Sequence, residues 1–275
     1  MNKLIYANLS RLSKDKVFFT CVVITIITGI LTPLLRYNSA KNFSNTFFLE
    51  GTFSACSIIL AILLAVFCSL FLGTEYSDGT IRNKIIIGHS RATIYYSFWF
   101  TNIIVVCILC TIYFIISLGI GLLLHGTFET DLRFVIALIL NMYILTIAYS
   151  SIFTLISMLN QNKALVAVIC ILSTLVFFML GTAIYAKLAE PEMIPANTST
   201  NGSPVYDVDT PNPSYVDGLE RGAYEFLYDF LPGGQMVQYA SMQVSTPYKL
   251  SIYSSIILVI TTGIGIKSFK KKDIK

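Results

Sequence analysis

The sequence predicts an all-α membrane protein that forms one transmembrane domain over residues 1–275, and two observations predict this class. Hydrophobic residues make up 55% of the chain and charged residues only 12%, so charged side chains are too few to cover a water-soluble surface. A helix needs about 20 apolar residues to cross ~30 Å of hydrocarbon. Six stretches have about that length or more, and we expect spans at residues 17–35, 54–73, 98–124, 134–159, 164–186 and 250–269.

The same composition excludes several other classes. Disordered chains are poor in apolar residues and rich in charge, which is the opposite imbalance. The formal net charge of +4 is small and spread along the chain, so we expect no nucleic-acid partner. All six cysteines fall inside apolar runs, where we expect them to pack as small hydrophobic residues without a disulfide framework or a metal site: Cys21, Cys56, Cys68, Cys107, Cys110 and Cys170.

Residues 1–16 are predicted to form an amphipathic helix, because apolar residues recur at helical spacing while basic residues occupy other positions. Directly before a span, such a helix is expected to lie in the cytoplasmic interface with its basic side toward anionic lipid headgroups. The apolar residues are Leu4, Ile5, Leu9 and Leu12, and the basic ones are Lys3, Arg11, Lys14 and Lys16.

The distribution of basic residues predicts that both termini are cytoplasmic. Lys and Arg concentrate in the cytoplasmic segments of membrane proteins. With the N-terminus inside, the inner segments hold 13 of the 19 basic residues, and six spans return the C-terminus to the same side. We therefore expect a multi-pass protein of the cytoplasmic membrane, with these basic residues outside: Arg36, Lys41, Arg133, Lys187, Arg221 and Lys249.

No Asp, Glu, Lys, Arg or His lies inside a predicted span away from its ends. Such residues at membrane depth are typical of proton relays and ion-coupled pumps, so their absence disfavours a secondary transporter and an intramembrane hydrolase. The most polar span residues are Asn102 and Asn141, which we expect to hydrogen-bond between helices.

The loop between the second and third spans, residues 74–91, carries the signals of a short capped helix. Thr80 is expected to cap a helix over residues 81–87, Gly88 to end it in the left-handed conformation, and Ser90 to cap the next helix. A helix of seven residues is marginal alone in water. Two arrangements would support it, namely docking onto a second protein or a hairpin tucked against the bilayer.

One family resemblance favours the first arrangement. The string Glu75-Tyr76-x-x-Gly79-Thr80-Ile81-Arg82-Asn83-Lys84, followed by Gly88-x-Ser90-Arg91, resembles the first cytoplasmic loop of the permease subunits of bacterial type-2 ATP-binding-cassette transporters. Weaker similarities lie at residues 4–19, at Tyr228-x-x-Leu231-Pro232-x-Gly234-Gln235, and in the tail from Phe269 to Lys275. The resemblance covers the whole chain, since six spans with both ends inside is that family's plan.

The resemblance implies that this loop is a coupling helix, which sits in a groove of a separate nucleotide-binding ATPase subunit. It implies that Glu75 steadies the loop by pairing with a nearby base. ATP and Mg²⁺ would bind to the partner, because this chain has no Gly-Lys pair and so no phosphate-cradling loop of its own. The chain is therefore expected not to be an enzyme by itself, and the residues expected to face or shape the ATPase contact are Gly79, Thr80, Ile81, Arg82, Asn83, Lys84 and Gly88.

The long segment 187–249 is predicted to be extracytoplasmic and to have two halves. Residues 191–213 hold five of the chain's eight prolines and are expected to be extended or mobile. An apolar face between Leu219 and Leu231 predicts a helix that Pro232-Gly233 ends, followed by a second short helix over residues 235–243. We expect both helices to lie on the outer leaflet or to cap a translocation path.

The expected function is ATP-driven export of an amphipathic substrate, with a second permease copy, identical or paralogous, and membrane lipids as further partners. By resemblance, the second and fifth spans line the path, which would place Phe67, Phe71, Phe177 and Phe178 on apolar walls. The outer segment carries eight acidic residues against three basic ones, which favours a cationic antimicrobial peptide, although a drug or lipid-like molecule remains open and the acids also serve to solvate a loop. The alternatives are a non-transporting immunity or sensor protein that binds a peptide at this segment, and a secondary transporter.

Overall fold

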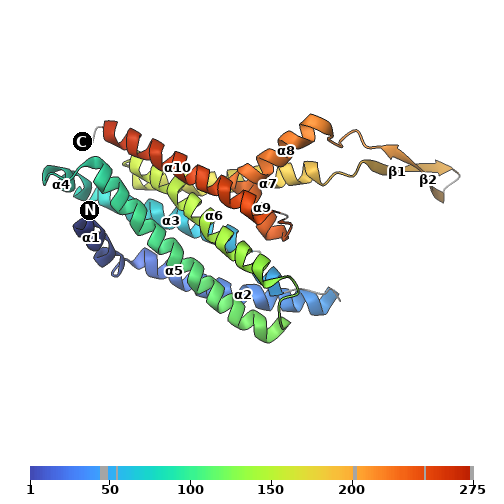
Figure 1. The fold of residues 1–275 in the computed structure, drawn as a ribbon, viewed down its shortest axis with the longest axis horizontal. Helices are drawn as coiled ribbons and strands as arrows, with labels where there is room; N and C mark the ends of the chain where they lie inside the picture. The colour runs from blue at the N-terminus through green and yellow to red at the C-terminus, as the bar shows by residue number, and fades with distance from the viewer. Residues whose placement is uncertain (44–48, 54, 201–202, 245, 273–275) are drawn as a thin grey trace.

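The computed structural model describes residues 1–43, 49–53, 55–200, 203–244 and 246–272. In this part of the chain, six helices are long and apolar enough to cross a membrane, as the sequence predicts. They form an elongated bundle from which a two-stranded ribbon projects at one end (Figure 1). The six helices are α2 (Lys16–Phe43), α3 (Cys56–Ser77), α5 (Arg91–His125), α6 (Leu132–Leu159), α7 (Lys163–Leu188) and α10 (Pro247–Lys271).

Shorter elements lie before and between these spans. The first expected helix, within residues 1–16, is present as α1. The bounds of these shorter elements are α1 (Asn2–Leu12), the 3-10 helix η1 (Leu49–Phe53), α4 (Thr80–Ile86), the strands β1 (Met193–Thr200) and β2 (Ser203–Pro211), α8 (Gly218–Phe230) and α9 (Pro232–Ser241).

The centre of the bundle is α3, whose apolar stretch is more buried than that of any other span in the described residues. It packs against α6 and α7, while α10 runs along α6 and α2 runs along α5. Most of α2 and α7 remains uncovered, as expected for helices that face lipid. All six cysteines are free thiols, and five of them are buried as packing residues, with Cys107 exposed on α5.

Both asparagines of the spans join neighbouring helices, so that prediction is confirmed. The Asn102 amide of α5 donates to the Thr154 hydroxyl of α6 at 2.7 Å. The Asn141 side-chain oxygen of α6 accepts a hydrogen bond from the Ser251 hydroxyl of α10. Each bond satisfies a polar group that the apolar surroundings would otherwise leave unpaired.

One end of the bundle, here called the loop end, carries both chain termini and α4 (Figure 1). The opposite end, here called the hairpin end, carries β1 and β2. Two spans extend further toward the loop end than their apolar runs predict: α3 continues to Ser77 and α5 begins at Arg91. Additional turns at the end of α3 and at the start of α5 therefore lengthen both helices, and α4 lies between them.

Turn geometry fixes the start of α4, and here one prediction is wrong. Gly79, not Thr80, is the N-cap, and its φ of 67° lies in the left-handed region that favours glycine. Thr80 is the first helical residue, and its hydroxyl donates to the main-chain carbonyl of Glu75 at 2.9 Å. The glycine makes the turn, and the threonine hydroxyl is used to tie the turn back to α3.

The predicted end of α4 is confirmed at Gly88, which has a φ of 100°. The N–H groups of Gly88 and His89 donate to the carbonyls of Ile85 (2.9 Å) and Lys84 (3.1 Å). This pair of hydrogen bonds is the Schellman motif at the end of a helix. The Ser90 hydroxyl then accepts from the Thr93 N–H at 3.2 Å, as predicted for the cap of α5.

At the hairpin end, the proline-rich segment is extended, because it forms the antiparallel pair β1 and β2. The pairing runs from Met193 opposite Pro211 to Thr200 opposite Ser203. The sequence did not predict that the two extended stretches would pair. Beyond the ribbon, α8 ends at Phe230 as expected and none of its residues is buried.

Of the two places expected for the helix before the last span, the outer leaflet is wrong for α9, whereas a cap on a translocation path stays a prediction. Its residues from Pro232 to Tyr239 are buried, and it packs mainly against α7, with further contacts to α3 and α6. Glycines make this possible: a Cβ atom at Gly233 would collide with the carbonyl of Phe177, and one at Gly181 with the backbone of Gly233. Since neither residue has a side chain, the two helix backbones approach closely.

Candidate functional site

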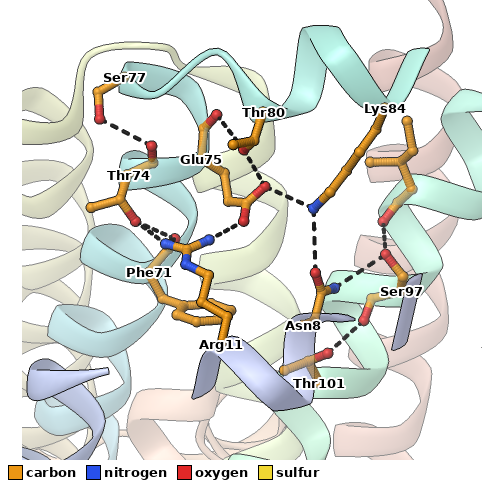
Figure 2. Close-up of polar contacts among 11 residues, drawn as sticks. Asn8, Arg11, Phe71, Thr74, Glu75, Ser77, Thr80, Lys84, Ser97 and Thr101 are labelled. Atoms are coloured by element: carbon orange, nitrogen blue, oxygen red, sulfur yellow. Dashed lines mark hydrogen bonds and ion pairs between the residues drawn. The ribbon is translucent and has the colours of Figure 1, made fainter. Parts of the chain in front are cut away.

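Glu75, in the last turns of α3, is the centre of a polar cluster at the loop end (Figure 2). Its side chain is only 4% exposed and pairs with two bases, Arg11 of α1 and Lys84 of α4. The Thr80 hydroxyl lies 2.5 Å from its Oε2, so its single proton is shared between this oxygen and the Glu75 main-chain carbonyl. A buried carboxylate needs such partners because water no longer solvates its charge. Asn8, Arg11, Glu75, Thr80 and Lys84 are called the Glu75 cluster below.

Lys84 turns inward from α4 and does not face solvent. Its ammonium lies 2.7 Å from Glu75 Oε2 and donates to Asn8 Oδ1 at 3.3 Å. It also lies 4.4 Å from the centre of the Phe98 ring, a cation–π geometry. The Lys84 side chain is only 16% exposed, and its contacts fix the position of α4 against the bundle.

Arg11 corrects the expectation that the basic residues of the first helix point toward lipid headgroups. Its guanidinium pairs with Glu75 and donates to the Phe71 carbonyl (3.0 Å) and the Thr74 hydroxyl. It also lies 4.5 Å from the centre of the Phe71 ring. The carbonyl and hydroxyl belong to the end of α3, so Arg11 joins α1 to that end instead of to the membrane surface.

The opposite face of α4 is exposed. Arg82 and Asn83 point away from the bundle, and Ile86 and Ile87 are 72% and 76% exposed. Ile81, by contrast, is 1% exposed and packs in the core. The predicted contact residues therefore divide: Arg82 and Asn83 are available to a partner, whereas Thr80, Ile81 and Lys84 hold the helix from behind.

Two of the four phenylalanines expected on a path are enclosed by the chain's own helices. Phe67 and Phe71 are fully buried and stack on each other with ring centres 5.1 Å apart, so they face no open path in this conformation. Phe177 and Phe178 of α7 are half-buried against the core. Gly233 of α9 lies directly on the backbone of Phe177.

Sequence reasoning missed Asn8 and Phe98 as parts of this site. Asn8 lies at the same four-residue spacing as the buried Leu4 and Leu12, on the apolar face of α1. Its amide donates to the Ser97 hydroxyl of α5 at 3.3 Å. A polar residue in the middle of an apolar helix face was the signal that could have indicated a specific buried partner.

The arrangement is suited to holding an element in place more than to chemistry. In the described residues, no group of three His, Cys, Asp or Glu side chains is placed to hold a metal ion. The Glu75 carboxylate joins α1 and α4 to the end of α3, and Asn8 links this cluster to α5 through Ser97, while the outer face of α4 stays exposed. No protein-family model matches this chain, and no curated protein matches its sequence.

Proposed function

We propose that this chain is the membrane-spanning permease subunit of an ATP-driven exporter of the ATP-binding-cassette type, in which α4 docks onto a separate ATPase subunit. The observation that carries the proposal is the two-sided environment of α4. Its inner face is fixed by the Glu75–Lys84 pair and by Ile81, while Arg82, Asn83, Ile86 and Ile87 are left exposed together. The loop motif resembles the coupling helix of such permeases, which supports the same assignment.

The exposed face has the composition of a docking surface. Two large isoleucine side chains exposed side by side gain free energy when a partner removes them from water, roughly 25 cal/mol per Å² of apolar area. An arginine at the edge of such a patch adds orientation and electrostatic steering. The helix is only seven residues long, so its caps and the Glu75 cluster hold it ready before the partner binds.

Sidedness is part of the proposal: the loop end faces the cytoplasm, where ATP is. Both termini lie at that end, and the segments there carry 13 of the 19 basic residues. On a background without the native cysteines, Ser90→Cys is expected to resist a membrane-impermeant thiol reagent in intact cells. Leu219→Cys on α8, whose native side chain is 96% exposed, is expected to react.

Equal labelling of the two sites would contradict this orientation. The reagent should label both sites after the cells are opened, which is the control for accessibility. The sequence also predicts that a cysteine at Asn201, within the segment expected outside, would be labelled; Asn201 lies outside the described residues, so Leu219 is used here.

The cargo we propose is a cationic, amphipathic molecule such as an antimicrobial peptide. The acidic excess of the outer segment supports this choice, although Asp229 is already paired with Lys249 at 2.6 Å. Asp217 precedes α8 without a side-chain capping bond and is therefore a better candidate. Neutralising Asp207, Asp209 and Asp217 together should lower resistance to such a peptide at low salt. Unchanged resistance would mean that these acids serve solubility.

A second candidate is a non-transporting membrane protein that binds a peptide at the hairpin end. The observation that favours it is the ribbon of β1 and β2, which projects away from the bundle (Figure 1). Such a protein would need no ATPase, so one experiment separates the two functions. The tagged chain is purified in mild detergent from the membranes of its native host.

The exporter proposal predicts that an ATPase with a Gly-rich phosphate loop co-purifies and that its ATP hydrolysis depends on this chain. A folded, monodisperse chain that purifies without any ATPase would contradict the proposal and favour the second candidate.

A further inference from the structure

The two residues that bound the turn and helix between α3 and α5 both contact the end of α10. Residues 78–90 are called the α4 loop here. Tyr76 stands just before this loop in the last turn of α3, and Arg91 just after it as the first residue of α5. Both meet the C-terminal turn of α10, about 180 residues further along the chain. The base of the α4 loop is thus closed by a segment that the loop motif itself does not include.

Lys272 makes the contact on the Tyr76 side. Its ammonium donates to the Tyr76 hydroxyl at 3.0 Å and to the Met158 carbonyl at 3.1 Å, and lies 4.1 Å from the centre of the Tyr76 ring. The Tyr76 hydroxyl in turn donates to the same Met158 carbonyl at 2.5 Å. Met158 lies in the last turn of α6, where main-chain carbonyls lack helical partners. One lysine thereby joins the ends of α3, α6 and α10.

Arg91 makes the contact on the other side. Its guanidinium donates to the carbonyls of Phe269 (3.4 Å) and Lys270 (3.1 Å) and to that of Lys272. These carbonyls belong to the C-terminal turn of α10, where a cation also complements the helix dipole. Arg91 therefore caps α10 from the start of α5.

The position of α10 against α5 is fixed one turn earlier. A Cβ atom at Gly265 would collide with the Tyr95 side chain, so the tyrosine occupies the space that a side chain would fill. The Tyr95 and Phe269 rings, both fully buried, lie with centres 6.3 Å apart. The C-terminal turn is therefore held in register before Lys272 reaches Tyr76.

We propose that the C-terminal turn of α10 is a latch that holds the base of the α4 loop, with Lys272 and Arg91 as its positioning residues. The Glu75 cluster holds the loop from the side of α1, and the latch holds it from the side of α10. Because α10 packs along α6 over much of its length, displacement of the loop passes into α6 and α10 as well as α3. The consequence for ATP-driven transport rests on the proposed function, whereas the latch itself does not.

Hydrogen–deuterium exchange of the purified chain in nanodiscs tests the latch without any partner. Lys272→Met keeps an unbranched side chain that reaches to the Cε position and removes the ammonium. It should raise the exchange rate of peptides covering residues 76–91 by about three- to tenfold, because charge-assisted hydrogen bonds to Tyr76 and Met158 are lost. Arg91→Gln should do the same. Lys271→Met is the matched control, since Lys271 is exposed, and should leave this exchange unchanged.

Unchanged exchange in both Lys272→Met and Arg91→Gln, with the fold intact by melting temperature, would overturn the latch. Faster exchange in a chain that binds no ATPase would uphold the latch and reject the exporter function instead. Where the ATPase does co-purify, Lys272→Met should retain binding and lose about three- to tenfold in stimulated ATP hydrolysis. Full stimulation despite faster exchange would overturn the role of the latch in coupling.

Discussion

The two ends of the bundle are held together by different forces. At the loop end, charged side chains hold the helices together: Glu75 lies between Arg11 and Lys84, and Arg91 and Lys272 bind carbonyls at helix ends. At the hairpin end, close backbone packing holds the helices together, because α9 approaches α7 through glycines, which have no side chain. The two ion pairs described there, Arg221–Glu225 and Lys249–Asp229, are more exposed than those of Glu75.

The two kinds of contact differ in how much helix movement they allow. Ionic contacts with several partners can break and re-form as helices shift, which would suit the movement of α4 with a partner that the proposed function requires. Backbone contacts at van der Waals distance leave no room to adjust, so α9 behaves as part of the core. Substitutions at the two ends should therefore destabilise the protein in different ways.

Gly233→Val should cause the largest loss. The new side chain would overlap the Phe177 carbonyl, a backbone atom that cannot turn aside, and should cost more than about 3 kcal/mol. Little folded protein should reach the membrane, as measured by detergent-solubilised yield and melting temperature. Gly222→Ala on α8 is the control, because a Cβ there meets nothing within 4 Å, and it should be neutral or slightly stabilising. Normal yield of Gly233→Val would show that α9 is not packed as described.

Glu75→Gln should be the next most damaging change. It leaves Arg11 and Lys84 close together without the carboxylate, at a cost of about 3 kcal/mol, the lower end for a buried pair because Arg11 is 30% exposed. Thermal unfolding in detergent measures this loss. Glu225→Gln on α8 removes an exposed carboxylate and should cost less than about 0.5 kcal/mol. Equal effects at the two positions would remove the contrast between the ends.

Gly88→Ala should have a moderate and local effect. Its φ of 100° is unfavourable for any residue with a Cβ, at a cost of about 1–2 kcal/mol, although space around it is open. Hydrogen exchange of the α4 loop should accelerate while the melting temperature of the bundle changes little. Gly119→Ala in α5, also in open space but with ordinary helical backbone, should cause neither change.

Composition and periodicity were sufficient to predict the six spans, since each apolar run became one helix. The loop motif predicted that Glu75 pairs with a base, and Lys84 is nine residues away in the same loop. Arg11 could not be assigned as its second partner, because that contact joins residues 64 positions apart and depends on how α1 packs.

The hairpin end was predicted less well, for a physical reason. A short apolar helix that lies on a membrane and one that inserts between spans have the same composition, so the sequence could not predict that α9 is buried against the spans. From the sequence, Gly233 was interpreted only as part of a helix stop with Pro232, and Gly234 only as part of the family resemblance. Their actual effect, close approach to α7 and α8, depends on which backbone lies opposite them.

Arg82→Glu provides the most direct test of the central claim that α4 is a docking element. Arg82 is exposed, so the change should leave the melting temperature and membrane level of the chain unaltered, within about 0.5 kcal/mol of stability. Its charge reversal at a desolvated contact should weaken binding by about 2–5 kcal/mol, or roughly 30-fold or more.

The measurement is co-purification of the ATPase subunit with Arg82→Glu, beside the matched charge reversal Arg221→Glu at the hairpin end. The account predicts that the ATPase is lost from Arg82→Glu and retained by wild type and by Arg221→Glu. Full retention of the ATPase and of its stimulated hydrolysis by Arg82→Glu would contradict the account and leave α4 as a turn between two spans.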